Sequence, residues 1–239
     1  DAMKEVFAAF GKAGRDLTRA DILWHALWPP LVAIVFWVTI GVGIWGHGIA
    51  VLSDVIPALP WSGWEWVAHW AAVFLLIAAF ASLTWFTAIL LVAVVALPKM
   101  IETVAARDYP DLGRHGENVF WGSLRVTLGA GLIFLLGWIV ILPLLLIPGA
   151  ILVLPLLWAT WLNQRTFRFD AVAEHATEAE RARLFREENT RFYFAGLGSA
   201  LAAHVPILNL LAPAFTALVF VHLGLTALRS QRQATGVQL

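Results

Sequence analysis

The chain has 239 residues, of which 60% are hydrophobic and 13% are charged, and its formal net charge is zero. A typical soluble domain has about 25% charged residues, so this composition indicates an integral membrane protein. The zero net charge excludes an overall electrostatic attraction for nucleic acid, and the absence of cysteine excludes disulfides, thiolate metal sites and cysteine nucleophiles. The common motifs of zinc proteases, nucleotide-binding loops, serine hydrolases and dinucleotide enzymes do not occur, so we expect neither an enzyme nor a bound cofactor or metal.

The N-terminal residues 1–21 have apolar side chains at near-helical spacing, with Lys4, Lys12 and Arg15 between them. This pattern predicts an amphipathic helix on the inner membrane surface. Residues 177–194 predict a second amphipathic or solvated helix, because Thr177 and Glu180 are spaced as a capping box.

Four long segments lack Asp, Glu, Lys and Arg altogether: 22–45, 67–97, 127–162 and 194–228. About 20 apolar residues suffice to cross the hydrocarbon core of a bilayer as a helix. The first two segments each fit one transmembrane helix. We therefore expect a single all-α membrane domain over residues 1–239.

The basic residues predict the topology of this domain. All Lys and Arg residues lie in residues 1–21, 98–126, 163–193 and 229–239, whereas the connection 46–66 has none. The positive-inside rule therefore predicts that 46–66 is an outer loop and that the other connections face the cytoplasm, with both chain ends.

The last two apolar segments begin and end at cytoplasmic connections, so neither is expected to form one spanning helix. Residues 127–162 would measure about 54 Å as a single helix, against a hydrocarbon core of about 30 Å. Prolines interrupt both segments, at positions 143, 148 and 155 and at positions 206 and 213. We predict two helical hairpins. They either penetrate the membrane partly, which their short arms favour, or form closely joined full spans.

Several polar or small residues in the last segment are candidates for a substrate pathway. A helix that ends inside the membrane presents free N–H groups, which favour an anion. Gly196, Gly198 and Ser199 would allow a ligand to approach closely, or equally would allow two helices to pack. His204 and Asn209 are polar residues within an apolar segment, which makes them candidates too.

The run from Phe194 to Pro213 includes a Phe-Ala-Gly start, then Pro206-Ile-Leu-Asn209 and a final proline. It resembles the signature of the CysZ-type sulfate permease family, the etoposide-induced domain membrane proteins. The resemblance extends along nearly the whole chain. It implies two long transmembrane helices plus two partly penetrating hairpins, in a bacterial inner membrane.

The resemblance also implies a set of pathway residues, Glu102, Arg107, Arg125 and Asp170, which match polar positions of the family. They either line the inner mouth of a pathway that opens between the hairpins, or extend to the inner membrane interface or pair structurally. One family feature is missing, because the anion-binding Gly-(Leu/Ile)-Arg-Arg sequence is replaced by Asp21-Ile-Leu-Trp24. No sulfate ligand is carried over there, since the guanidinium donors are lost.

Two functions follow from these observations. The first is an anion permease or channel that moves sulfate or a similar small oxyanion into the cytoplasm. The alternative, suggested by the missing arginines, is a non-transporting interaction or scaffold protein with the same fold. In either case we expect contact with the lipid bilayer and a homo-oligomer, because hairpins that end in the bilayer need their backbone ends covered.

Overall fold

The computed structural model describes residues 2–56 and 63–236, and all regular secondary structure in these residues is helical. Residues 57–62 of the expected outer loop lie outside the described residues, as do the last three residues of the C-terminal tail. The chain divides into two units. One comprises residues 24–96, and the other combines residues 1–23 with 97–239.

The unit of residues 24–96 contains most of α2 (Ala20–Val55), α3 (Trp64–Leu91) and a π-helical turn at Val92–Ala96. Helix α2 continues well beyond residue 45, so residues 46–55 of the expected loop are helical. The two helices meet through small residues: Gly41 faces the ring of Phe80, and Gly48 faces Leu76. The indole of Trp37 donates a hydrogen bond to Thr87 Oγ1 at 2.9 Å, which ties the two apolar helices together.

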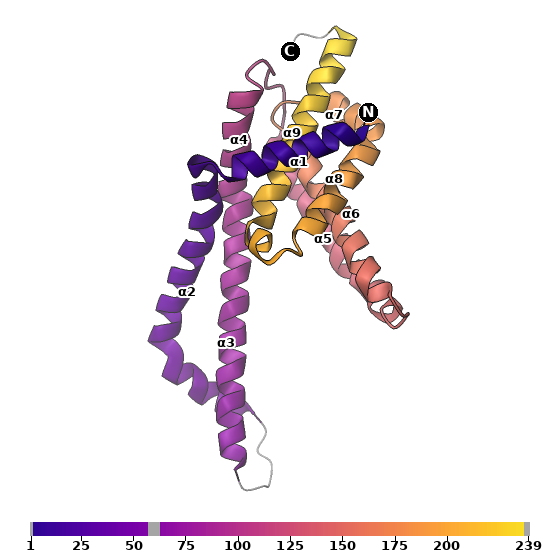
Figure 1. Cartoon of the computed structure of the whole chain (residues 1–239). Helices are drawn as coiled ribbons and strands as arrows, with labels where there is room; N and C mark the ends of the chain where they lie inside the picture. Colours follow the sequence, from indigo (N-terminus) through magenta and orange to yellow (C-terminus); the bar gives the residue numbers. More distant parts are fainter. Residues whose placement is uncertain (1, 57–62, 237–239) are drawn as a thin grey trace. The chain divides into compact units, whose positions relative to one another are not determined.

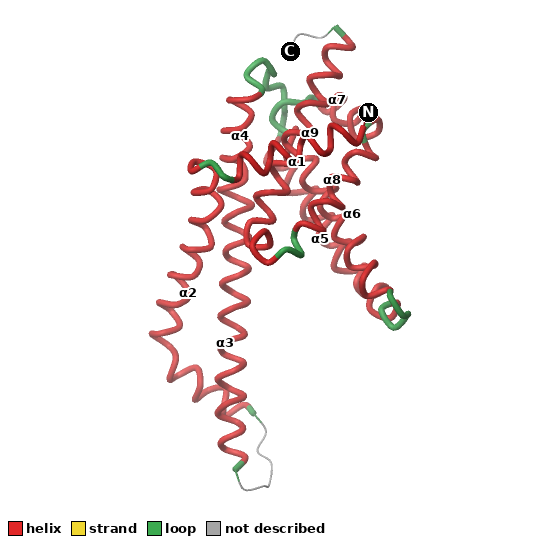
Figure 2. The backbone as a smooth tube through the Cα atoms, viewed as in Figure 1, coloured by secondary structure: helices red, strands yellow, loops and turns green. Residues whose placement is uncertain are grey.

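The second unit is built around one central helix, α9 (Pro206–Thr235), as Figure 1 and Figure 2 show. Helices α1, α4, α6, α7 and α8 all contact α9, and most side chains from Ala214 to Leu228 are buried. The bounds of the surrounding helices are α1 Ala2–Leu17, α4 Leu97–Asp108, α5 Val119–Leu144, α6 Ala150–Val172, α7 Glu178–Glu187 and α8 Asn189–Ala202.

Two pairs of consecutive helices in this unit are joined by short turns. Helices α5 and α6 lie side by side and are joined through residues 145–149, where Gly149 takes a φ of 82° that a side chain would strain. Helices α8 and α9 are joined through residues 203–205, and Pro206 occupies the first position of α9, where its missing N–H costs no hydrogen bond. The prolines at 155 and 213 lie inside helices and do not end them, whereas α5 ends at Leu144, directly after Pro143.

Among the described residues, four helical segments are long and apolar enough to cross a membrane: Ala20–Val55, Trp64–Thr84, Val119–Leu144 and Leu211–Thr235. In the most apolar stretch of each of the first three segments, few residues are buried, as lipid contact requires, whereas 78% of the corresponding stretch of the fourth segment is buried by the chain itself. Helix α8 has 14 residues and a length of about 21 Å, which is too short to cross the hydrocarbon core. The chain is therefore an all-helical, multi-pass membrane protein.

The N-terminal helix α1 uses its apolar side chains mainly for contacts within the protein. Val6 and Leu17 are buried, and the ring of Phe10 lies 5.8 Å from that of Phe215 in α9. Met3 and Phe7 remain exposed, so only part of the predicted apolar face is available to a membrane surface. Helix α1 thus lies across α9 and α8 and covers them (Figure 1).

We expect a side chain at Gly196 to disturb the contact between α8 and α6. A Cβ atom there would lie 2.9 Å from the backbone oxygen of Thr160, so Gly196→Ala should destabilise the protein by about 1–3 kcal/mol. Thermal unfolding of the detergent-purified protein should show a midpoint lowered by several degrees. Gly129→Ala is the control, because a Cβ atom there meets nothing within 4 Å. Equal midpoints for the two variants would contradict this prediction.

Candidate functional site

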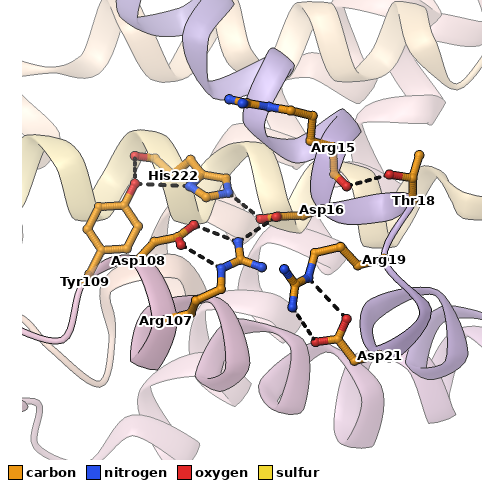
Figure 3. A network of polar contacts seen from close by, with 9 residues as sticks. All are labelled: Arg15, Asp16, Thr18, Arg19, Asp21, Arg107, Asp108, Tyr109 and His222. Atoms are coloured by element: carbon orange, nitrogen blue, oxygen red, sulfur yellow. Dashed lines mark hydrogen bonds and ion pairs between the residues drawn. The ribbon is translucent and has the colours of Figure 1, made fainter.

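A buried polar network joins α1, the end of α4 and α9 (Figure 3). Asp16 of α1 accepts a hydrogen bond from Arg107 Nη2 at 2.6 Å, and its other oxygen lies 2.7 Å from His222 Nε2. Arg107 also donates to both carboxylate oxygens of Asp108, at 2.6 and 2.7 Å. Asp16 and His222 are almost wholly buried, so a buried hydrogen bond as well as apolar contact fixes α1 to α9.

The second nitrogen of His222 is engaged by Tyr109. The two atoms are 3.1 Å apart, and the Tyr109 hydroxyl also lies 3.0 Å from Thr226 Oγ1. Burial raises the pKa of Tyr109, and the hydrogen bond from Arg107 holds the pKa of Asp108 below its usual range. The tyrosine is therefore neutral and Asp108 is ionised at neutral pH.

This network contains the residue types of a metal site, but the atoms that would bind a metal already have other partners. Ligand atoms of Asp16, Asp108 and His222 lie within 4.8 Å of one another. The Arg107 guanidinium already binds both carboxylates, and both ring nitrogens of His222 have partners. A cation would have to displace a guanidinium that forms charge-assisted bonds, so the arrangement fits a structural ion-pair network.

A second polar cluster surrounds Arg232 near the end of α9. Arg232 is 1% exposed and donates to Glu180 of α7, to the backbone oxygens of Gly113 and His175, and to His115 Nδ1. Thr177 and Glu180 form the predicted capping box at the start of α7. The cluster joins the two loops on either side of α5–α6 to α9.

A row of polar side chains lies buried along one face of α6. Thr160, Gln164 and Arg168 are spaced four residues apart, which places them one above another on a helix, and each is at most 8% exposed. This face contacts α8, where Gly196 brings the two backbones close together. The Gln164 side-chain oxygen and the Ser199 hydroxyl are buried without a hydrogen-bond partner among the described residues.

The four residues expected at an inner mouth make separate contacts in the structure. Glu102 pairs with Lys99 at 3.1 Å and with Arg114 at 3.8 Å, and Arg107 belongs to the Asp16 network. Asp170 accepts a hydrogen bond from Ser123 at 2.6 Å, and burial raises its pKa. Arg125 is exposed and forms no ion pair with any residue that the structure describes.

The candidates in the last apolar segment lie on different sides of α8 and α9. Gly196 faces α6, whereas a Cβ atom on Gly198 would lie 2.5 Å from the ring of Phe10 in α1. Ser199 is 1% exposed. His204 is exposed in the turn and lies 2.8 Å from the Ala200 backbone oxygen, and Asn209 is exposed in the first turns of α9. The glycines thus provide helix packing on both faces of α8.

Sequence reasoning missed the residues with the most buried polar contacts. No local pattern shows that His222 binds Asp16, which is 206 positions away. Gln164 and Arg168 fall in the predicted cytoplasmic connection 163–193, and the structure buries both in α6. The four-residue spacing of Thr160, Gln164 and Arg168 is a signal that could have identified this face.

Comparison with family models gives a match to "Sulfate transporter CysZ/Etoposide-induced protein 2.4" over residues 9–213. The match covers most of the chain and includes the second half of α1, the helices α2 to α8 and the first turns of α9. Comparison with curated proteins and with solved structures gives no match.

We expect Asp16→Asn to release α1 from the rest of its unit. Removing a partner of a buried ion pair costs about 3–5 kcal/mol, because Arg107 loses one of its two carboxylates and His222 loses its charged partner. Limited proteolysis should then cut α1 faster, and the thermal midpoint should fall. Glu187→Gln is the control, since the Arg183–Glu187 pair is about half exposed and such pairs contribute at most about 1 kcal/mol. Equal proteolysis rates for both variants would show that Asp16 does not anchor α1.

We expect the stability of the protein to fall as the pH is lowered from 6.5 to 4. Burial, with help from the nearby charges of Arg114 and Arg232, lowers the pKa of His175 from 6.5 to about 4. Between pH 6.5 and 4, His175 binds a proton in the unfolded chain but not in the folded chain. The free energy of unfolding should therefore fall by about 1–3 kcal/mol. Chemical denaturation at a series of pH values measures the slope of the free energy of unfolding against pH.

The variant His175→Gln should lose this slope, because it removes the titrating ring. His204→Gln should keep it, since His204 lies exposed in the turn before α9. A slope that persists unchanged in His175→Gln would assign the acid sensitivity to another group.

Proposed function

This chain belongs to the sulfate transporter CysZ/etoposide-induced protein 2.4 family, and from that premise we propose that it is a permease or channel for sulfate or a similar small oxyanion. The family match is the observation that carries the proposal, since it covers residues 9–213. The proposed direction is into the cytoplasm, across a bacterial inner membrane in which both chain ends are cytoplasmic. The positive-inside distribution of Lys and Arg supports this orientation.

The proposed architecture has α2 and α3 as full spans and the pairs α5–α6 and α8–α9 as hairpins that enter from the cytoplasmic side. The short length of α8 supports partial penetration of the second hairpin. For the first hairpin, α5 is long enough to span, whereas the second half of α6 carries buried polar side chains. Polar groups at membrane depth are tolerated where protein or water surrounds them, which favours a protein-lined location for this face of α6.

A homo-oligomer is part of the proposal, because α5 leaves nearly all of its apolar surface uncovered within the chain. Of the apolar window of Val119–Leu144, only 6% is buried. Lipid and a second copy of the chain can both cover such a surface.

Arg125 and Asp170 are proposed pathway residues on α5 and α6. Arg125 is exposed, so its guanidinium is available to an anion. Asp170 accepts a hydrogen bond from Ser123 and forms no ion pair with a basic side chain of the described residues, so it would repel an anion that stayed bound too long. Glu102 and Arg107 are proposed to contribute to the electrostatic field at the inner mouth of the pathway. Their shortest ion pairs are nevertheless structural: Glu102 pairs with Lys99, and Arg107 pairs with Asp16 and Asp108.

Flux through the purified protein tests the proposed function. Liposomes that contain the protein should take up labelled sulfate faster than empty liposomes, and selenate and sulfite should compete more strongly than chloride. Sulfate uptake no faster than in empty liposomes, with a folded protein in the bilayer, would contradict sulfate transport and would favour the non-transporting scaffold.

We expect Arg125→Ala to reduce sulfate flux about tenfold, which corresponds to the loss of one charge-assisted contact in the pathway. The matched control is Arg186→Ala in α7, which removes one exposed arginine outside the proposed pathway and should leave flux unchanged. Equal flux in the two variants would assign Arg125 to the membrane interface, where a long basic side chain extends to the headgroups.

A further inference from the structure

Helix α1 has one buried face and one exposed face. The buried face packs on α8 and α9 and consists of Val6, Ala9, Ala13, Asp16 and Leu17. The exposed face, which we call the outer row of α1, consists of Met3, Lys4, Phe7, Ala8, Gly11 and Arg15. Steps of three or four residues along a helix keep side chains on one side of it. The outer row is therefore one continuous surface on the side of α1 that faces away from α9.

The charges of α1 are divided between these two faces. Its acidic side chains have partners inside the protein, since Glu5 pairs with Arg191 at 2.7 Å and Asp16 pairs with Arg107 at 2.6 Å. Arg15 lies on the outer row and forms no ion pair with any residue that the structure describes, and Figure 3 shows its guanidinium outside the Asp16 network. The outer row therefore carries positive charge and no carboxylate.

The outer row also exposes large apolar side chains beside this charge. Phe7 is 69% exposed and Met3 is 42% exposed. Gly11 lies between Phe7 and Arg15, and a Cβ atom there would meet nothing within 4 Å. Exposed aromatic and basic side chains on one helix are typical of helices that lie in the headgroup layer of a membrane, where the ring contacts acyl chains and the cation binds phosphate.

The direction of α1 agrees with a position along the membrane plane. The helix runs across α9, whose stretch Leu211–Thr235 has the length and composition of a membrane span (Figure 1). Only Thr18 and Arg19 separate α1 from α2, which is a second candidate span. The proposed cytoplasmic location of the chain ends puts α1 at the inner leaflet, where anionic lipids attract basic side chains.

We infer that the outer row of α1 binds anionic phospholipid at the inner membrane surface, with Arg15 at a lipid phosphate and Phe7 among the acyl chains. This surface differs from the apolar face that the sequence predicts for membrane contact, because the structure buries Val6 and Leu17 of that face against protein. The inference rests on the proposed function for the cytoplasmic side of α1. It assigns a lipid ligand to a surface that has no part in the proposed anion pathway.

Quenching of a fluorophore on α1 by brominated lipid tests this surface. The chain has no cysteine, so Gly11→Cys gives a single labelling site on the outer row. The labelled full chain is placed in phosphatidylcholine vesicles that contain a minor fraction of brominated phosphatidylglycerol or, in a parallel sample, of brominated phosphatidylcholine. We expect the anionic lipid to be enriched about fivefold near the label, as one basic side chain at the surface would produce. A label at Glu187→Cys, on the exposed side of α7, should be quenched much less by both lipids.

Exposed variants identify the residues that bind the lipid. Arg15→Gln should remove most of the preference for phosphatidylglycerol, whereas Arg186→Gln makes the same change in charge on α7 and should keep it. Phe7→Ser should reduce quenching by both lipids, with an unchanged thermal midpoint, because the exposed ring supports no packing inside the protein. An unchanged preference in Arg15→Gln, or equal quenching by the two lipids, would overturn the recognition of anionic lipid. No quenching by either lipid would overturn the surface and assign the outer row to water or to a second copy of the chain.

Sulfate flux separates this inference from the proposed function. A preference for phosphatidylglycerol that depends on Arg15, in a protein without sulfate flux, would contradict transport alone. Sulfate flux through a protein that shows no such preference would contradict the lipid surface alone.

Discussion

The structure of the larger unit depends on how the buried polar side chains of α9 are satisfied. Helix α9 has the composition of a membrane span, yet 78% of its apolar window is covered by the chain itself. His222 and Arg232 are buried by the surrounding helices, and burying either side chain without a hydrogen-bonding partner would cost free energy. Asp16 and Tyr109 bind the first, and Glu180 with two backbone oxygens binds the second. The position of α1, the end of α4 and the loop before α7 follow from these bonds.

The sequence was sufficient for features that depend on local patterns. Uncharged segments predicted helices of membrane length, and the prolines and glycines of the third and fourth segments marked the neighbourhood of the turns at residues 145–149 and 203–205. The spacing of Thr177 and Glu180 predicted the capping box of α7. Proline had less effect than expected at 155 and 213, because a helix tolerates the missing bond near its ends or where other helices cover it. Helix α5 does end directly after Pro143.

Contacts between distant parts of the chain could not be predicted in this way. The Asp16–His222 bond joins residues 206 positions apart, and nothing in the spacing of either residue shows the other. The same holds for Glu5 and Arg191, which pair across 186 positions. The resemblance to the family identified Arg107 as a pathway residue, yet its geometry is that of an anchor between Asp16 and Asp108. Local sequence patterns predict where the helices form, whereas the partners of charged side chains depend on how the helices pack.

Whether a buried charge has a partner distinguishes the two most deeply buried arginines of the described residues. A charge held by a carboxylate, as in the Arg232 cluster, fixes one arrangement of the helices around it. Arg168 is 8% exposed and has only the Asn189 amide oxygen and the Phe185 ring as partners among the described residues. The cost of burying its charge is therefore offset by one hydrogen bond and a cation–π contact, so the packing of α6 against α7 and α8 depends on these two neighbours.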